Sequence, residues 1–320
     1  MLTTNVLYFP YIRVPDSTWF TRILLYWDQI HTITPYDFVR NPERLDNHTR
    51  RLIQEGLVIQ IIPGYHINDI PRFVSSFMEW LDSLGPDVIE RRRNAFQSTG
   101  DGFKIHLEKV DHLTNSLESL GLALMGSYPW LKVEPETAQE FMTYLAASLG
   151  RLDQLNSAPV TDDGQYLRHF VSKSGAMTRL DDLRIVVLDE LFPAPSRFLE
   201  PAEIANFKAR YGAQLTQFRR RVEQQLIDIT DVSDDELRTR RLELFLDEVR
   251  GDVAAIRERM ASHGWVTTLT KLSAIVAAIP GVSPLLGLAN AVYSAFAGSE
   301  MTKVTSPFLY AAEAQRLLTP

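Results

Sequence analysis

Residues 6–30 read VLYFPYIRVPDSTWFTRILLYWDQI, and this stretch decides the fold of the first part of the chain. Its opening run of β-branched and aromatic residues predicts a strand, and Pro10 places that run at a sheet edge or a strand end. Asp16 or Ser17 can cap the helix that follows. From Trp19 onward the apolar residues recur at spacings of one, three and four, which is typical of an amphipathic helix.

A second strand completes a small α/β unit. Residues 42–55 predict a polar helix, which Gly56 ends. Residues 57–62 read LVIQII and predict a short buried strand, because a Pro-Gly pair closes the apolar run. The order strand, helix, helix, strand predicts a small α/β unit over residues 1–66.

Beyond this unit the apolar residues follow a helical period. One stripe of large apolar side chains runs over 70–84, a second over 107–124 and a third over 138–149. Residues 183–192 read LRIVVLDELF and fit either a strand or a buried helix. We expect a helical domain over 67–199, in which residues 156–164 form a loop by composition.

Two long amphipathic segments come next. The first begins at Pro201, and the second follows a capping box made of Ser233 and Glu236. Because a short polar loop joins them, they predict a long antiparallel αα-hairpin over 200–264. Arg and Glu alternate on their outer faces, and such mixed charge is typical of a solvated surface rather than of a nucleic-acid site.

The final segment, 265–320, contains a long run without any charged residue between Lys271 and Glu300. Its length would suffice to cross a bilayer once, but prolines and a glycine interrupt it near the middle. Its Ala, Ser and Gly residues favour close helix packing, so we expect an apolar helical hairpin in a protein core or between two copies. Membrane insertion of 272–297 and a surface for another protein are the alternatives. The candidate interaction residues are Leu272, Ile275, Leu285, Gly287, Ala291 and Ala295.

The composition excludes several classes of protein. The 320 residues contain no cysteine, which rules out disulfides and thiolate metal sites and fits a cytoplasmic protein. The net charge of -7 argues against a protein that coats nucleic acid. The N-terminus lacks the basic and apolar regions of a cleaved signal peptide. The fold class that we expect is mainly α.

One polar cluster has the spacing of metal ligands. Glu108, Asp111 and His112 share a helix face at spacings of three and four, although a solvated face beside a leucine stripe explains them more simply. Asp162 and Asp163 lie in a loop and are candidates for a cation site or an acid–base pair. Turn formation through backbone hydrogen bonds is the simpler explanation there too.

Other chemistry has little support in the sequence. Asp189 and Glu190 follow an apolar run, as in a Walker B site, but no GxxxxGK[ST] motif accompanies them. GxSxG, HExxH and GxGxxG are absent as well. The aromatic residues of the opening stretch, among them Tyr8 and Tyr11, either frame a ligand pocket or pack the first strand on the first helix. We therefore predict no catalytic residue and no cofactor.

The stretch LYFPYIRVPDSTWFTRILLYWDQIHTITP resembles the opening of a bacterial family of domains of unknown function. EGLVIQIIP, FMTYLAASLG with the TDD loop, and LFPAP followed by FKARYGAQLTQFRRRVE extend the resemblance over roughly Leu7 to Glu223. The resemblance implies a bacterial intracellular protein of accessory or mobile genome regions, for which a role in defence against phage is an extrapolation.

The leading hypothesis is a non-enzymatic interaction or structural subunit of a bacterial intracellular assembly. Its expected partner is a second copy or another protein, and no nucleic acid. A membrane-acting effector that uses residues 272–297 is one alternative. A carboxylate- or metal-dependent hydrolase or nuclease is the other, and it requires the acidic candidates to converge in the folded chain.

Overall fold

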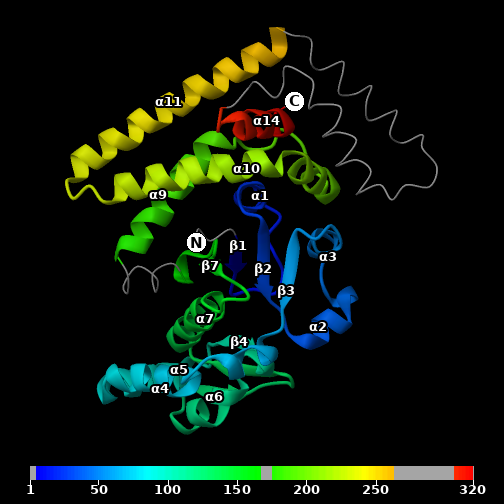
Figure 1. Ribbon diagram of the computed structural model, residues 1–320. Coiled ribbons are helices and arrows are strands. Elements are labelled where there is room, and N and C mark those ends of the chain that lie inside the picture. The colour runs from blue at the N-terminus through cyan, green and yellow to red at the C-terminus, as the bar shows by residue number, and fades with distance from the viewer. Residues whose placement is uncertain (1–4, 167–174, 263–305, 320) are drawn as a thin grey trace. The chain divides into compact units, whose positions relative to one another are not determined.

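The computed structural model describes residues 5–166, 175–262 and 306–319 (Figure 1). The chain divides into two compact units, residues 1–175 and 176–320, and each is described by itself. The fold is mainly α, as the sequence predicts, and it contains two small sheets. This division differs from the four predicted segments. The helix at residues 135–150 and the strand at residues 157–160 both belong to the first unit.

A parallel sheet forms the first part of unit 1. Its strands are β1 (Asn5–Tyr8), β2 (Gln29–Ile33), β3 (Val58–Ile61) and β7 (Ser157–Val160). They lie in the order β3-β2-β1-β7, and every neighbouring pair is parallel. Because the strands run the same way, their carboxyl ends meet at one edge of the sheet, which we call the carboxyl edge.

The predicted first strand and first helix are present with shorter bounds, and the second predicted strand, residues 57–62, is β3. The hydroxyl oxygen of Ser17 accepts a hydrogen bond from Phe20 N and caps α1 (Thr18–Tyr26). The predicted helical spacing continued to Ile30, which is too far, because the backbone turns extended at Trp27 and β2 begins two residues later.

Short helices connect the next strands. They are α2 (Tyr36–Arg40), the 3-10 helix η1 (Pro42–Arg44) and α3 (Asn47–Gln54), followed after β3 by η2 (Pro63–Tyr65) and η3 (Ile67–Asp69).

Residues 157–160 were predicted as part of a loop, and this prediction is wrong. They form β7, an outer strand of the sheet that pairs with β1 from Asn5↔Ser157 to Tyr8↔Val160. Pro159 made the stretch look like a loop, but a proline fits an outer strand, where one side needs no hydrogen-bond partner.

The second part of unit 1 holds four helices and a small antiparallel sheet. Its helices are α4 (Phe73–Ser83), α5 (Pro86–Thr99), α6 (Leu107–Ser119) and α7 (Pro135–Gly150). Its strands are β4 (Phe103–His106), β5 (Ala123–Met125) and β6 (Trp130–Val133), in the order β4-β6-β5. The apolar stripes predicted α4, α6 and α7 but not α5, and none of the three strands was predicted, which are only three or four residues long.

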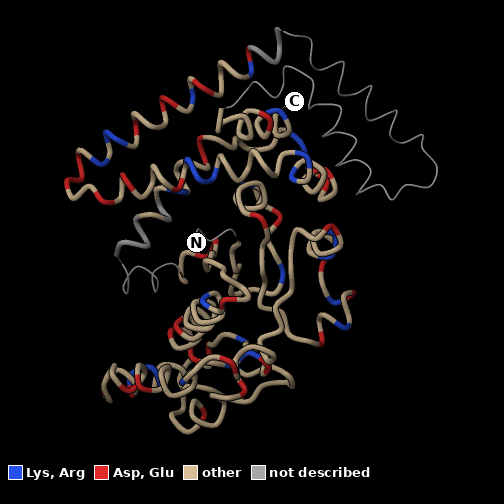
Figure 2. The backbone as a smooth tube through the Cα atoms, in the orientation of Figure 1, with Lys and Arg blue, Asp and Glu red and all other residues tan. Residues whose placement is uncertain are grey.

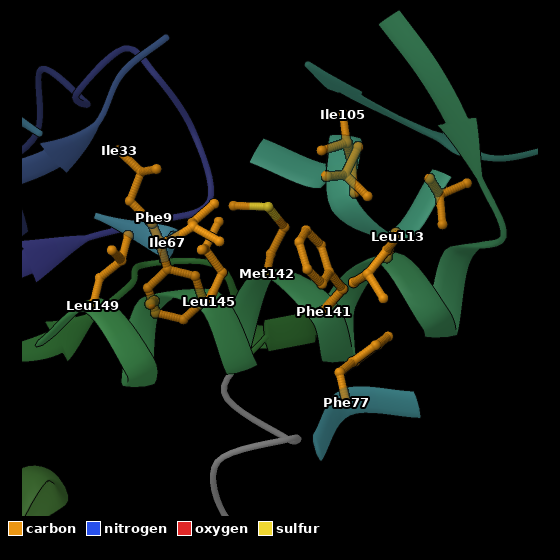
Figure 3. Packing of buried hydrophobic residues seen from close by; sticks show 14 of the residues in the cluster. Phe9, Ile33, Ile67, Phe77, Ile105, Leu113, Phe141, Met142, Leu145 and Leu149 are labelled. Atoms are coloured by element: carbon orange, nitrogen blue, oxygen red, sulfur yellow. The ribbon is translucent and has the colours of Figure 1, made fainter. Parts of the chain in front are cut away.

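Helix α7 joins the two parts of unit 1 through one core (Figure 3). Leu149 and Leu145 lie near Phe9 and Ile33 of the parallel-sheet side, whereas Phe141 lies near Phe77 of α4. The ring centroids of Phe77 and Phe141 are 5.4 Å apart. This continuous core therefore spans both parts of unit 1.

Unit 2 consists of helices in its described part: α9 (Gly175–Leu191), α10 (Pro201–Thr230), α11 (Asp235–Ser262) and α14 (Leu309–Leu318). Residues 183–191 therefore belong to a helix, which resolves the ambiguity of that apolar run. Asp234, not the predicted Ser233, accepts the hydrogen bond from Leu237 N at the start of α11.

Ion pairs and aromatic rings hold these helices together. Arg184 of α9 forms two hydrogen bonds with the buried Glu223 of α10, at 2.7 and 2.8 Å. Arg221 of α10 bonds Glu248 of α11 at 2.9 Å, and Phe308 before α14 lies 6.3 Å from Phe218 of α10. Along α10 and α11 both signs of charge alternate, as expected (Figure 2).

The predicted interaction residues between Leu272 and Ala295 lie outside the described residues. So does most of the predicted apolar hairpin, of which the structure describes residues 306–319. Within the described ranges no helix is both long and apolar enough to cross a membrane.

The shared core makes a testable prediction. Phe141→Ala removes a fully buried ring between α4 and α7, so we expect the free energy of unfolding to fall by about 3–5 kcal/mol. Urea unfolding followed by circular dichroism measures the change. The exposed Leu124→Ala is the control, with an expected change within about 0.5 kcal/mol. Equal effects of the two substitutions would contradict this account of the core.

Candidate functional site

The start of α6, residues Leu107–Lys109, lies on the carboxyl edge of the parallel sheet. Glu108 Oε2 accepts a hydrogen bond from Tyr36 N, after β2, at 2.7 Å. Its carboxylate also accepts a hydrogen bond from the backbone N–H of Gly64, after β3. A side chain at Gly64 would place its Cβ 3.3 Å from Glu108 Oε1, so a glycine allows this close approach.

The residues on either side of Glu108 hold two further segments. Lys109 Nζ donates to the carbonyl oxygen of Pro10, after β1, at 3.2 Å. Leu107 N donates to the carbonyl oxygen of Pro129, in the turn between β5 and β6, at 2.9 Å. Three consecutive residues therefore connect the loops after β1, β2 and β3 with the β5–β6 turn.

Lys109 is a buried amine in this arrangement. Burial lowers its pKa to about 7, against the opposing attraction of the Glu108 carboxylate. Burial also raises the pKa of Glu108, which the hydrogen bond from Tyr36 N opposes. Desolvation therefore disfavours the charged form of each of these two groups.

His106 caps α6 from the preceding strand. Its Nδ1 accepts a hydrogen bond from Glu108 N at 3.3 Å, so in the neutral ring the proton sits on Nε2. That nitrogen faces Asp37 Oδ1 at 3.4 Å, which is long for a hydrogen bond. Burial lowers the pKa of His106, although Asp37 attracts the charged form. Asp37 in turn pairs with Arg44, whose guanidinium lies 4.3 Å above the ring of Phe38.

Exposed tyrosines surround the α6 start. Tyr11, Tyr36, Tyr65 and Tyr128 expose 46, 42, 63 and 85% of their surface. Tyr36 itself forms a hydrogen bond with the α6 start. Tyr11, Tyr65 and Tyr128 are the sequence neighbours of Pro10, Gly64 and Pro129, which are the other residues that the α6 start binds. Among the described tyrosines these are the exposed ones.

Three of these tyrosines follow neighbouring strands. In the order β3, β2, β1 the residues are Tyr65, Tyr36 and Tyr11, and we call them the tyrosine row. The rings of Tyr36 and Tyr65 lie 6.1 Å apart at an angle of 48°. Adjacent strands are about 4.8 Å apart, so a row of side chains at their ends suits an extended ligand.

Two carboxylates extend this row at the end of β7. Tyr11 Oη donates to Asp163 Oδ2 at 2.6 Å, and the buried Tyr8 donates to Asp162 Oδ1 at 2.9 Å. Burial and the neighbouring Asp163 raise the pKa of Tyr11 to about 12, so its hydroxyl stays protonated near neutral pH. Asp163 Oδ1 also accepts from Gln165 N at 2.9 Å, which agrees with the expected turn-forming role.

The structure separates the predicted acidic candidates. Glu108, Asp162 and Asp163 lie at the carboxyl edge. Asp111 and His112 are exposed further along α6. Asp189 and Glu190 belong to α9 in unit 2, where Glu190 pairs with Arg250. In the part of the chain that the structure describes, no group of three or more histidine and acidic side chains is placed to hold a metal ion.

Sequence reasoning missed Lys109 and two members of the row, Tyr36 and Tyr65. A signal was present, since Pro10–Tyr11, Pro35–Tyr36 and Pro63–Tyr65 each put a tyrosine just after a proline at a strand end. It becomes meaningful only once the three strands are known to be parallel neighbours.

Comparison with known proteins adds no relative. No protein-family model, no curated protein and no solved structure matches the chain. The fold and the site define a two-unit chain with a parallel α/β sheet and a tyrosine-lined carboxyl edge. The resemblance to a bacterial family of domains of unknown function stays a prediction.

The contact of Glu108 with two backbone amides makes a second prediction. Glu108→Ala leaves the amides of Tyr36 and Gly64 without their carboxylate acceptor, so we expect a loss of about 1–3 kcal/mol in the free energy of unfolding. Glu108→Gln keeps an acceptor oxygen and should cost less in the same urea titration. Equal losses of stability in the two variants would show that the acceptor oxygen at position 108 does not stabilise the fold.

Lys109 makes a third prediction, which concerns pH. The folded chain binds a proton at Lys109 only up to about pH 7, whereas an unfolded lysine holds its proton up to about 10.5. The unfolded chain thus binds more protons between these values, so this residue makes the free energy of unfolding rise with pH there. The slope approaches about 1.4 kcal/mol per pH unit and disappears below pH 7.

Denaturant unfolding of the wild type and of Lys109→Met at several pH values between 7 and 10 measures this slope. We expect the wild-type stability to gain on the variant as the pH rises. Parallel pH profiles would mean that Lys109 keeps an ordinary pKa in the folded chain.

Proposed function

We propose that this chain is a non-enzymatic interaction protein, a subunit of a bacterial intracellular assembly, which binds its partner through the tyrosine row. The observation that carries the proposal is the presence of three exposed tyrosines after three neighbouring parallel strands. A role in defence against phage is the part of the proposal that depends on the family resemblance.

The location of the row supports a binding role. Open parallel sheets bind their ligands at the carboxyl ends of the strands. Here the loops at those ends are joined to the α6 start through Glu108 and Lys109, which restricts their movement. A surface whose backbone is fixed before binding loses little conformational entropy when a partner arrives.

The chemistry of tyrosine also supports recognition of another chain. Its ring buries a large area with few rotatable bonds, and its hydroxyl still forms hydrogen bonds, so tyrosine is enriched where proteins bind each other. The three tyrosines of the row expose between 42 and 63% of their surface, which suits a partner that lies across the carboxyl edge.

The acidic candidates fit positioning roles better than hydrolysis. Glu108 binds two backbone amides, and Asp162 and Asp163 accept hydrogen bonds from the hydroxyls of Tyr8 and Tyr11. In each pair the carboxylate orients a loop or a ring of the tyrosine-lined edge. These contacts favour the interaction hypothesis over the hydrolase alternative.

Unit 2 supplies the assembly part of the proposal. We infer that α10 and α11 form the antiparallel αα-hairpin expected from sequence, with Arg221 and Glu248 as one of its cross-links. Long paired helices with mixed surface charge present an extended face to neighbouring subunits. The apolar residues 272–297 are a further proposed contact with a second copy or another protein.

A selection from a library of random linear peptides tests the proposal. We expect selected peptides to bind the wild type and to bind the double variant Tyr36→Ala, Tyr65→Ala at least about tenfold more weakly, because truncated aromatic hot spots cost about 2 kcal/mol or more. Fluorescence anisotropy gives the affinities.

Phe198→Ala is the matched control, since it removes an exposed aromatic ring from unit 2. Circular dichroism confirms that all variants fold. Peptides that bind the double variant as tightly as the wild type would contradict the proposed role of the tyrosine row.

A further inference from the structure

Charge is distributed unevenly along the tyrosine row. At the β7 end stand Asp162, which is exposed, and Asp163, which is half-buried. Beside the middle ring of the row, the exposed Arg40 places its guanidinium 5.8 Å from the ring centre of Tyr36. The β7 end of the row is therefore acidic, and a ligand with a basic end would match it.

The distance between two rings of the row matches the rise of a polyproline II helix over two residues. A polyproline II helix rises about 3.1 Å per residue, so two residues span about 6 Å. The rings of Tyr36 and Tyr65 are 6.1 Å apart. Proline rings pack on aromatic side chains, and the free carbonyl groups of such a helix can accept hydrogen bonds from tyrosine hydroxyls.

From these two observations we propose that the partner segment is an extended, proline-containing peptide with a basic end, which lies along the tyrosine row and directs that end at Asp162 and Asp163. The inference rests on the proposed function and adds the chemical class and the direction of the ligand. The prolines pack against Tyr65 and Tyr36, and the two carboxylates bind the lysine or arginine.

The hydrogen bonds at the acidic end suit this role. Because the hydroxyls of Tyr8 and Tyr11 donate to Asp162 and Asp163, the carboxylates are held at the end of the row rather than left to rotate. A guanidinium or ammonium group that reaches them gains a charge-assisted hydrogen bond. The same contact gives a salt-dependent affinity.

Single-stranded nucleic acid is the main rival ligand, since bases also stack on rows of aromatic rings. Its phosphates would face the carboxylates of Asp162 and Asp163, and the whole chain carries a net charge of -7. Like charges so close oppose binding, so the observations favour the basic peptide. An oligothymidylate probe makes this rival an outcome of the test.

Fluorescence anisotropy with four labelled probes tests the inference on the full chain. The probes are a proline-rich peptide that ends in two arginines, the same peptide ending in two glutamates, a version with glycine and serine in place of proline, and oligothymidylate. We expect the arginine-ended proline peptide to bind best and each other probe to bind at least about tenfold more weakly, or ~1.4 kcal/mol.

The double variant Asp162→Asn, Asp163→Asn identifies the acidic end. Asparagine keeps one acceptor oxygen, so residue 162 still accepts from Tyr8, whereas residue 163 must share one oxygen between Tyr11 and Gln165 N. Circular dichroism checks that the variant folds. We expect the variant to lose about tenfold in affinity for the arginine-ended peptide, with a weaker salt dependence. Asp111→Asn removes an exposed acid elsewhere in unit 1 and should change nothing.

Several results would overturn the inference. They are equal binding of the arginine- and glutamate-ended peptides, tighter binding of oligothymidylate, an unchanged affinity in the aspartate variant, or no binding of any proline probe. If library peptides still need Tyr36 and Tyr65 in that case, the proposed function stands and only the ligand class is wrong. If library peptides bind equally well without Tyr36 and Tyr65, the proposed function and the further inference are both wrong.

Discussion

The hydrogen bonds between the start of α6 and the carboxyl edge of the parallel sheet are the interaction on which unit 1 depends. Parallel strands leave their carboxyl-end loops without support from a hairpin partner, because each strand continues into a crossover connection. Glu108 and Lys109, at the start of α6, supply that support through hydrogen bonds with Tyr36, Gly64 and Pro10. The cost is a buried amine and a partly buried carboxylate, which the hydrogen bonds offset.

The same interaction explains how a mainly helical chain presents aromatic rings at one edge. α7 packs against the parallel-sheet side with Leu145 and Leu149 and against α4 with Phe141, so the two parts form one body. The α6 start then lies over the strand ends, and the tyrosines beside its hydrogen-bonded residues stay exposed. In this arrangement Asp162 and Asp163 orient rings, and we propose that they also meet the ligand.

The elements with strong local signals could be predicted from sequence. α7 begins with Pro135 and has a regular apolar stripe, and α1 has the hydroxyl cap Ser17. β2 and β7 could not be predicted, because Ile30 continued a helical spacing and Pro159 read as a loop residue. Their strand character comes from pairing with β1, which is a long-range contact.

The site shows the same limit. Glu108, Asp162 and Asp163 stood out as polar residues, yet their partners Tyr36, Tyr11 and Tyr8 are far away in the sequence. From local spacing a solvated face or a turn was the simpler interpretation and metal ligation an alternative, whereas the fold gives these carboxylates distant hydrogen-bond donors. The recurring tyrosines after Pro10, Pro35 and Pro63 carried the better signal, but only the strand order makes them a row.

Ring spectra of isotope-labelled tyrosine, compared by NMR between the wild type and Glu108→Ala, test the central claim most directly. If the α6 start holds the separate loops together, the signals of Tyr11, Tyr36 and Tyr65 shift together, while those of the buried Tyr26 and Tyr310 stay in place. A shift confined to Tyr36, the direct partner of Glu108, would contradict it, because the three tyrosines would then be positioned independently.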